Sequence, residues 1–121
     1  MISLSKAQGG IGPVLKGQAG EAKSEQEAID VGEKVRGRQV TFELPSGKRT
    51  RPDLVTDTPA SELKVREAKN GPSARLTPGQ TELKKTIDKG GPLIPRGANA
   101  QKAGLKPGEP VTIKHFEEDR Y

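Results

Sequence analysis

The chain has 121 residues, of which 30% are apolar and 31% are charged, and its formal net charge at pH 7 is +5. It contains no cysteine, which excludes disulfide bonds and thiolate metal ligands. No stretch approaches the roughly 18 apolar residues that a membrane span requires, and the first residues lack the apolar segment of a signal peptide. The composition predicts a small basic domain with a modest core, and its positive charge suits an anionic partner such as nucleic acid.

The N-terminal segment, residues 1–20, is rich in glycine and is predicted to be flexible, with the single folded domain spanning residues 21–121. A glycine-rich N-terminal segment of this kind is typical of a domain that forms the C-terminal part of a larger polypeptide. Residues 21–36 are predicted to form a helix, because Ser24 and Glu27 have the spacing of a capping box and a thin apolar stripe follows.

Three strands are predicted next. Polar and apolar residues alternate over 39–44, which indicates a half-buried strand. The turn residues at 45–48 should then form a hairpin that leads into a second strand at 51–57. Another turn, at 58–61, precedes a third strand at 62–70. The middle of the chain is therefore expected to form a sheet.

The clearest helix signal covers residues 77–89. Thr77 suits the N-cap position, and Gln80 stands where a reciprocal capping partner is expected. A short strand at 93–94 and a last strand at 111–116 complete the pattern. We therefore expect one α/β domain, in which a mixed sheet is flanked by helices.

The third strand carries charges on an unexpected face. Because side chains alternate along a strand, Glu67 and Lys69 share the face that begins with the apolar Leu63 and Val65. A purely structural strand would keep charges on its opposite face, where desolvation costs little. The placement predicts a polar pocket at the strand's end, and Asp53 would lie across from Glu67 if the two strands pair through the turn at 58–61.

These residue types suggest a metal site. The carboxylates of Asp53 and Glu67 would supply the hard oxygen ligands that Mg²⁺ prefers, and Mn²⁺ can take its place. Lys69 would orient or help to deprotonate a water molecule and offset charge on a phosphate. This combination predicts metal-assisted hydrolysis of a phosphodiester bond.

The spacing of these residues resembles the signature of the PD-(D/E)xK nuclease superfamily. The matching tripeptides are Arg51-Pro52-Asp53 and Glu67-Ala68-Lys69. The resemblance implies a restriction-endonuclease-like core, with Asp53 and Glu67 as metal ligands and Lys69 as the catalytic lysine. Ala68 departs from the family pattern, which usually has a bulky apolar residue there.

The same resemblance points to two supporting positions. An acidic residue on the helix before the sheet often completes such sites, which implies Glu21 as a further metal ligand, with Glu25 as the alternative. A glutamine after the lysine strand commonly lines the site, and Gln80 fits this position. Gln80 also satisfies the capping-box spacing, and the two roles are compatible.

The run from Val65 to Gly71, followed by residues 76–80, looks like the nuclease domains that end bacterial polymorphic toxins, including contact-dependent growth inhibition toxins. This resemblance covers roughly residues 20–90. It implies a chain secreted as the C-terminal part of a larger effector, which cleaves DNA or tRNA in the cytoplasm of a target bacterium. It also implies a cognate immunity protein, which we expect to be acidic.

Two simpler interpretations remain open. The carboxylates and lysine could form surface ion pairs on a charged sheet, and the chain could be a non-catalytic basic module that binds nucleic acid through phosphate contacts alone. Both nucleic-acid hypotheses use the basic residues that are expected to flank the site. These are Lys48, Arg49, Arg51, Arg66 and Arg75.

Overall fold

The structure is a computed structural model that describes residues 12–69, 71 and 73–120. Its elements follow the order α2 (Gly12–Asp30), β1 (Lys34–Arg38), β2 (Thr41–Glu43), β3 (Arg49–Thr50), β4 (Leu54–Asp57), β5 (Leu63–Lys69), α3 (Pro78–Asp88), β6 (Ile94–Arg96), α4 (Ala98–Lys102) and β7 (His115–Arg120). Strands β1, β4, β5 and β7 form one sheet in that order, and β3, β2 and β6 form a second, smaller sheet.

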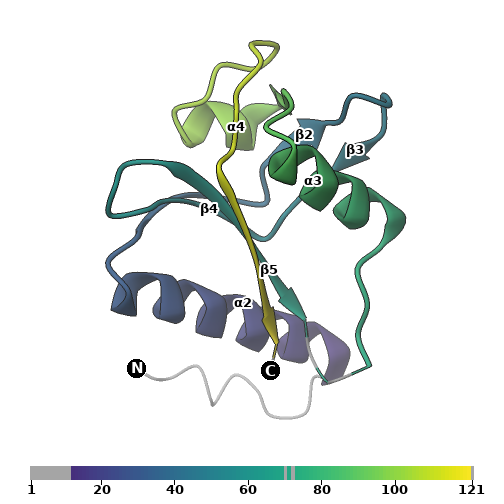
Figure 1. The fold of residues 1–121 in the computed structure, drawn as a ribbon. Coiled ribbons are helices and arrows are strands. Elements are labelled where there is room, and N and C mark those ends of the chain that lie inside the picture. Colours follow the sequence, from purple (N-terminus) through teal and green to yellow (C-terminus); the bar gives the residue numbers. More distant parts are fainter. Residues whose placement is uncertain (1–11, 70, 72, 121) are drawn as a thin grey trace.

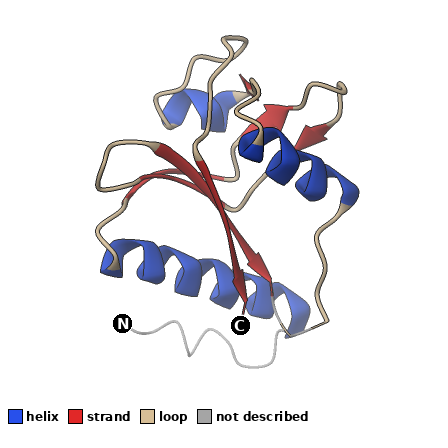
Figure 2. Cartoon of the chain, viewed as in Figure 1, coloured by secondary structure: helices blue, strands red, loops and turns tan. Residues whose placement is uncertain are grey.

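The larger sheet is mixed, as predicted. Its β1–β4 and β4–β5 pairs are antiparallel, whereas β5 and β7 run parallel. Helix α2 lies along one side of this sheet, and α3 and the small sheet lie on the other (Figures 1 and 2). The fold is therefore α/β, with a mixed sheet flanked by helices. None of the described helices is both long and apolar enough to cross a membrane.

The hydrophobic core lies between the larger sheet and α3. Val55 and Val65, on neighbouring strands, belong to the same buried cluster as Phe42 of β2 and Leu83 and Ile87 of α3. Each of these side chains is at most 4% exposed. Burial of one such side chain stabilises a fold by roughly 1.5–3 kcal/mol, so this cluster anchors α3 and the small sheet to the strands that carry the predicted site.

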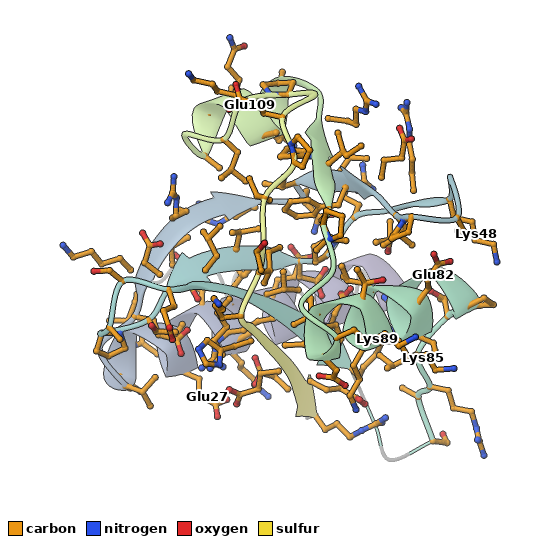
Figure 3. All side chains as sticks on the ribbon, turned by 45° about the horizontal axis from the view of Figure 1, so that its top comes forward. Glu27, Lys48, Glu82, Lys85, Lys89 and Glu109 are labelled. Atoms are coloured by element: carbon orange, nitrogen blue, oxygen red, sulfur yellow. The ribbon has the colours of Figure 1, made fainter. Side chains whose placement is uncertain are left out.

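Helix α3 begins with the predicted capping box. The Thr77 hydroxyl accepts a hydrogen bond from the Gln80 N–H at 3.2 Å, and Gln80 Oε1 accepts one from the Thr77 N–H at 2.9 Å. Farther along α3, Glu82 accepts hydrogen bonds from the backbone N–H and the hydroxyl of Ser46, at 3.2 and 2.7 Å. Figure 3 shows Glu82 facing the β2–β3 turn, which also carries Lys48.

The first helix differs from its predicted span at both ends. It begins at Gly12, nine positions before residue 21, and it ends at Asp30 instead of residue 36. Gly32 stops it in a left-handed conformation (φ +86°), with the N–H of Glu33 bonded to the carbonyl of Ala28 at 2.9 Å. Residues 12–20 of the segment predicted to be flexible thus lie in α2, and residues 1–11 lie outside the described residues.

The strands also differ in detail. The predicted turn at 45–48 does connect β2 to β3, but β3 lies before the predicted second strand at 51–57. That strand is shortened to β4, which joins the other sheet. Pro52 lies between β3 and β4, where its missing N–H suits a strand boundary. The sequence pattern does not predict β1 or α4. The last strand, predicted at 111–116, lies farther along the chain, because β7 covers His115–Arg120 and Val111 forms only an isolated bridge with Leu93.

Candidate active site

Asp53 and Glu67 are brought together by the pairing of β4 with β5. The last paired residues are Leu54 and Arg66, and one further step of this register places Asp53 opposite Glu67. Asp53 Oδ2 also accepts a hydrogen bond from the backbone N–H of Ala68 at 2.8 Å. The juxtaposition expected from the turn at 58–61 is therefore present, and the Asp53 carboxylate is fixed to the strand that carries Glu67.

The Glu67 carboxyl is buried and incompletely hydrogen-bonded. The residue is 1% exposed, and its Oε2 atom has no hydrogen-bond partner within the described part of the chain. Burial, followed by the nearby charge of Asp53, raises the pKa of Glu67 from 4.5 to about 8, although the positive charge of Lys69 opposes this shift. Without a cation, Glu67 is therefore mostly protonated at neutral pH.

Lys69 is the last residue of β5 and lies on the same strand face as Glu67. Its side chain is only partly buried. Because its charge lowers the pKa of Glu67, the ammonium group is close enough to act on that carboxyl. Lys69 is thus a cationic group near the Glu67 carboxyl.

Gln39 is a site residue that the sequence did not reveal. Its Nε2 atom donates hydrogen bonds to Glu21 Oε1 at 3.0 Å and to Asp53 Oδ1 at 3.2 Å. The Gln39 backbone N–H donates to the Asp53 carbonyl at 3.1 Å, and the Gln39 carbonyl accepts from Asn99 Nδ2 at 3.1 Å. Gln39 therefore connects α2 to the start of β4, directly beside the Asp53 carboxylate.

Of the two glutamates considered on α2, Glu21 is the one that approaches Asp53. Glu25 instead accepts a hydrogen bond from Arg38 Nε at 3.1 Å and forms an ion pair with that side chain. Within the described residues, Glu21, Asp53 and Glu67 do not bring one carboxylate oxygen each within 4.8 Å of one another. A hollow of about 250 Å³ adjoins Glu21, and it is lined by Glu21, Ala22, Glu25, Arg38 and Leu54.

Gln80 is half-buried at the start of α3, and its side-chain oxygen is engaged by the Thr77 N–H in the capping box. The capping interpretation is therefore confirmed. A second role for Gln80 beside the carboxylates stays a prediction.

Arg66 does not flank the site, and its expected phosphate contact is wrong. The side chain is 1% exposed, and its Nη1 atom donates to both carboxylate oxygens of Asp119, at 3.0 and 2.9 Å. Its Nε atom donates to Glu33 Oε1 at 3.0 Å. Arg66 points to the sheet face opposite that of Glu67, because neighbouring strand residues alternate, and there it lies in a buried ion network beneath α2.

A second acidic group lies in this network. Glu27, Glu117 and Asp119 each place a carboxylate oxygen within 4.8 Å of the other two. Lys64 Nζ donates to Glu117 at 2.6 Å, and Arg66 and the Ser24 hydroxyl donate to Asp119. These cationic and hydroxyl partners balance the group and explain it as part of the packing between α2 and the sheet.

The remaining basic residues proposed as phosphate contacts are exposed. Arg49 and Arg51 line a shallow hollow with Thr41 and Thr50, and Arg51 stands two positions before Asp53. Lys48 and Arg75 are also exposed, on the β2–β3 turn and on the segment before α3. Unlike Arg66, these side chains are free of the buried network and accessible to an anionic partner.

Comparisons of the chain with protein-family models, with curated proteins and with solved structures give no match. Functional interpretation therefore starts from the geometry around Asp53 and Glu67.

Proposed function

We propose that this chain is a Mg²⁺-dependent nuclease of the PD-(D/E)xK type that acts as the toxic part of a larger secreted bacterial effector. The observation that carries the proposal is the buried Glu67 carboxyl, which faces Asp53 and whose Oε2 atom has no hydrogen-bond partner among the residues that the structure describes. A buried carboxyl oxygen with an unmade bond is costly unless the site serves a ligand.

The donor set fits a hard divalent cation. Asp53 and Glu67 offer carboxylate oxygens, and a cation between them would offset the burial and repulsion that raise the pKa of Glu67 to about 8. Glu21 would complete the set from α2, where it already lies beside Gln39 and Asp53. When bound, Mg²⁺ would lower the pKa of a water molecule and stabilise negative charge on the phosphate.

Other residues of the chain would position the metal ligand, the attacking water and the substrate. The Ala68 N–H holds the Asp53 carboxylate, and Lys69 supplies a positive charge that can orient the attacking water. The exposed Arg49 and Arg51 would hold the nucleic-acid backbone close to Asp53. Such contacts position a substrate without reading its sequence, so DNA and tRNA are both substrates of suitable chemistry.

A toxin of this kind requires a cognate immunity protein, and it would act in the cytoplasm of the target bacterium. We expect the immunity protein to be acidic, because the side chains around the site that remain accessible include Lys48, Arg49, Arg51 and Arg75. Complementary charge would also speed association.

Cleavage assays test the proposal directly. The purified chain is incubated with plasmid DNA and with total tRNA, in Mg²⁺ and in EDTA, beside the variants Asp53→Asn and Lys69→Ala. Cleavage should require Mg²⁺ and be lost in both variants. Glu25→Gln is the matched control, because Glu25 lies on the same helix as Glu21 but pairs with Arg38; it should remain active.

The competing function is a basic module that binds nucleic acid without cleaving it. That module would shift nucleic acid in EDTA and leave it intact in Mg²⁺. Each of the three substitutions would change its affinity for nucleic acid only through the change in charge.

A further inference from the structure

The side-chain amide of Gln39 has only one possible orientation. Glu21 Oε1 and Asp53 Oδ1 are both carboxylate oxygens, which accept hydrogen bonds and cannot donate them when ionised. The NH₂ group of Gln39 must therefore face both residues, and it donates to them at 3.0 and 3.2 Å. One neutral group with two donors thus lies between two acidic side chains.

The backbone holds Gln39 in this place. Its φ angle is +54°, in the left-handed region that few residues other than glycine adopt. Its N–H and carbonyl are engaged by the Asp53 carbonyl and the Asn99 side chain. Because these contacts maintain an unfavourable backbone conformation, the position of the amide is built into the fold.

We propose that the Gln39 amide is a placeholder for the metal ion. In the metal-free protein its NH₂ group keeps Glu21 and Asp53 next to each other, and cation binding displaces it. The inference rests on the proposed function, since it concerns the same site. The Gln39 nitrogen lies 3.0 Å from Glu21 Oε1 and 3.2 Å from Asp53 Oδ1, so it occupies the space that a cation bridging these two oxygen atoms would fill.

The spacing of the carboxylates agrees with this interpretation. Within the described residues, Glu21, Asp53 and Glu67 do not converge to within 4.8 Å, and the amide lies between the first two. The hollow of about 250 Å³ beside Glu21 leaves that side chain room to rearrange. Displacement of the amide would let the acidic groups close around an ion.

The inference predicts that removal of the amide strengthens metal binding. Gln39→Gly and Gln39→Asn are suitable variants, because both residues tolerate the left-handed conformation and neither side chain can span Glu21 and Asp53 as glutamine does. Mn²⁺ alone is titrated into each metal-free protein by calorimetry. Both variants should bind Mn²⁺ severalfold more tightly than the unchanged chain.

Two controls separate the possible outcomes. Arg38→Lys weakens the neighbouring α2–β1 contact while keeping its charge, and it should leave Mn²⁺ affinity unchanged. If the unchanged chain binds Mn²⁺ and Asp53→Asn does not, but the Gln39 variants bind equally or more weakly, the placeholder inference is overturned and the metal site stands. If Asp53→Asn binds Mn²⁺ as the unchanged chain does, the metal site itself, and with it the proposed function, is wrong.

A spectroscopic signal gives a second measurement. The side-chain NH₂ resonances of Gln39, identified by their absence in Gln39→Gly, should shift on addition of Mg²⁺ as their two hydrogen bonds break. Resonances that stay in place while Mg²⁺ binds would overturn the inference.

Discussion

Asp53 Oδ2 accepts the backbone N–H of Ala68 at 2.8 Å, and Ala68 is the residue that separates Glu67 from Lys69. This side chain extends the pairing of β4 and β5 beyond the last backbone pair. The bond fixes one oxygen of Asp53, and the other oxygen accepts a hydrogen bond from Gln39. A backbone group of β5 and the side chain of Gln39 therefore set the position of this carboxylate together.

Asp53→Ala should abolish cleavage with little loss of stability. The substitution removes the acceptor for the Ala68 N–H, and a hydrogen bond of this kind contributes about 0.5–1.5 kcal/mol. It also removes the carboxylate that raises the pKa of Glu67, which offsets part of that loss. Chemical denaturation and a cleavage assay on the same preparation check this. A variant that is folded and fully active would exclude Asp53 from the mechanism.

The stability of the metal-free chain should depend on the ionisation of Glu67. Its pKa is raised from 4.5 to about 8 by burial and by Asp53, so the folded state binds a proton more tightly than the unfolded state. The favourable contribution is complete below pH 4.5 and is lost as the pH rises through 8. Denaturation in EDTA across this range should show a falling free energy of unfolding.

Glu67→Gln is the matched control for this pH dependence, because glutamine keeps the size of the side chain and cannot ionise. The variant should show a flatter profile between pH 4.5 and 8. If Mn²⁺ binds at Glu67, adding it should raise the melting temperature of the unchanged chain more than that of the variant. An unchanged profile would show that another group causes the dependence.

Arg66→Met should be strongly destabilising. Arg66 is 1% exposed, and its removal leaves the buried carboxylates of Glu33 and Asp119 without their main partner. Loss of one member of a buried ion pair costs about 3–5 kcal/mol. The exposed Arg75→Met should change the free energy of unfolding by less than about 0.5 kcal/mol. Equal effects in a denaturation experiment would contradict the buried network.

Gln80→Glu separates the two roles considered for Gln80. Glutamate also serves at this position of a capping box, so the helix start and the melting temperature should be preserved. Gln80→Ala should lower stability by about 0.5–1.5 kcal/mol, because it removes the hydrogen bond that Gln80 Oε1 accepts from the Thr77 N–H. If Gln80 supports the site, cleavage falls in Gln80→Glu although the protein is as stable as before; normal cleavage would limit Gln80 to capping.

Local signals predicted the elements that carry the site. The turn between β4 and β5 predicted the antiparallel pairing, and the period of two in β5 predicted that Glu67 would face inward. Thr77 and Gln80 predicted the start of α3. These signals succeed because their physical causes, turn geometry, side-chain alternation and capping, act over a few residues.

The features that local signals do not predict depend on contacts between residues that are distant in sequence. Arg66 is buried because Glu33 and Asp119 neutralise it, and these lie 33 and 53 positions away. The alternation over 39–44 predicts a regular strand at Gln39, whereas this residue has a left-handed backbone and contacts Glu21 and Asp53. Neither arrangement leaves a local pattern in the sequence.

The parallel pairing of β5 with β7 has a consequence for the order of folding. Six residues of β5, Lys64 to Lys69, pair with His115 to Arg120, about fifty positions farther along the chain. Closing so long a loop is entropically unfavourable, and such contacts usually form after local turns and helices. The strand that carries Glu67 and Lys69 should therefore gain its second neighbour late. Substitutions in β7 should therefore accelerate unfolding more than they slow folding. The residues of the candidate site would reach their final arrangement late in folding.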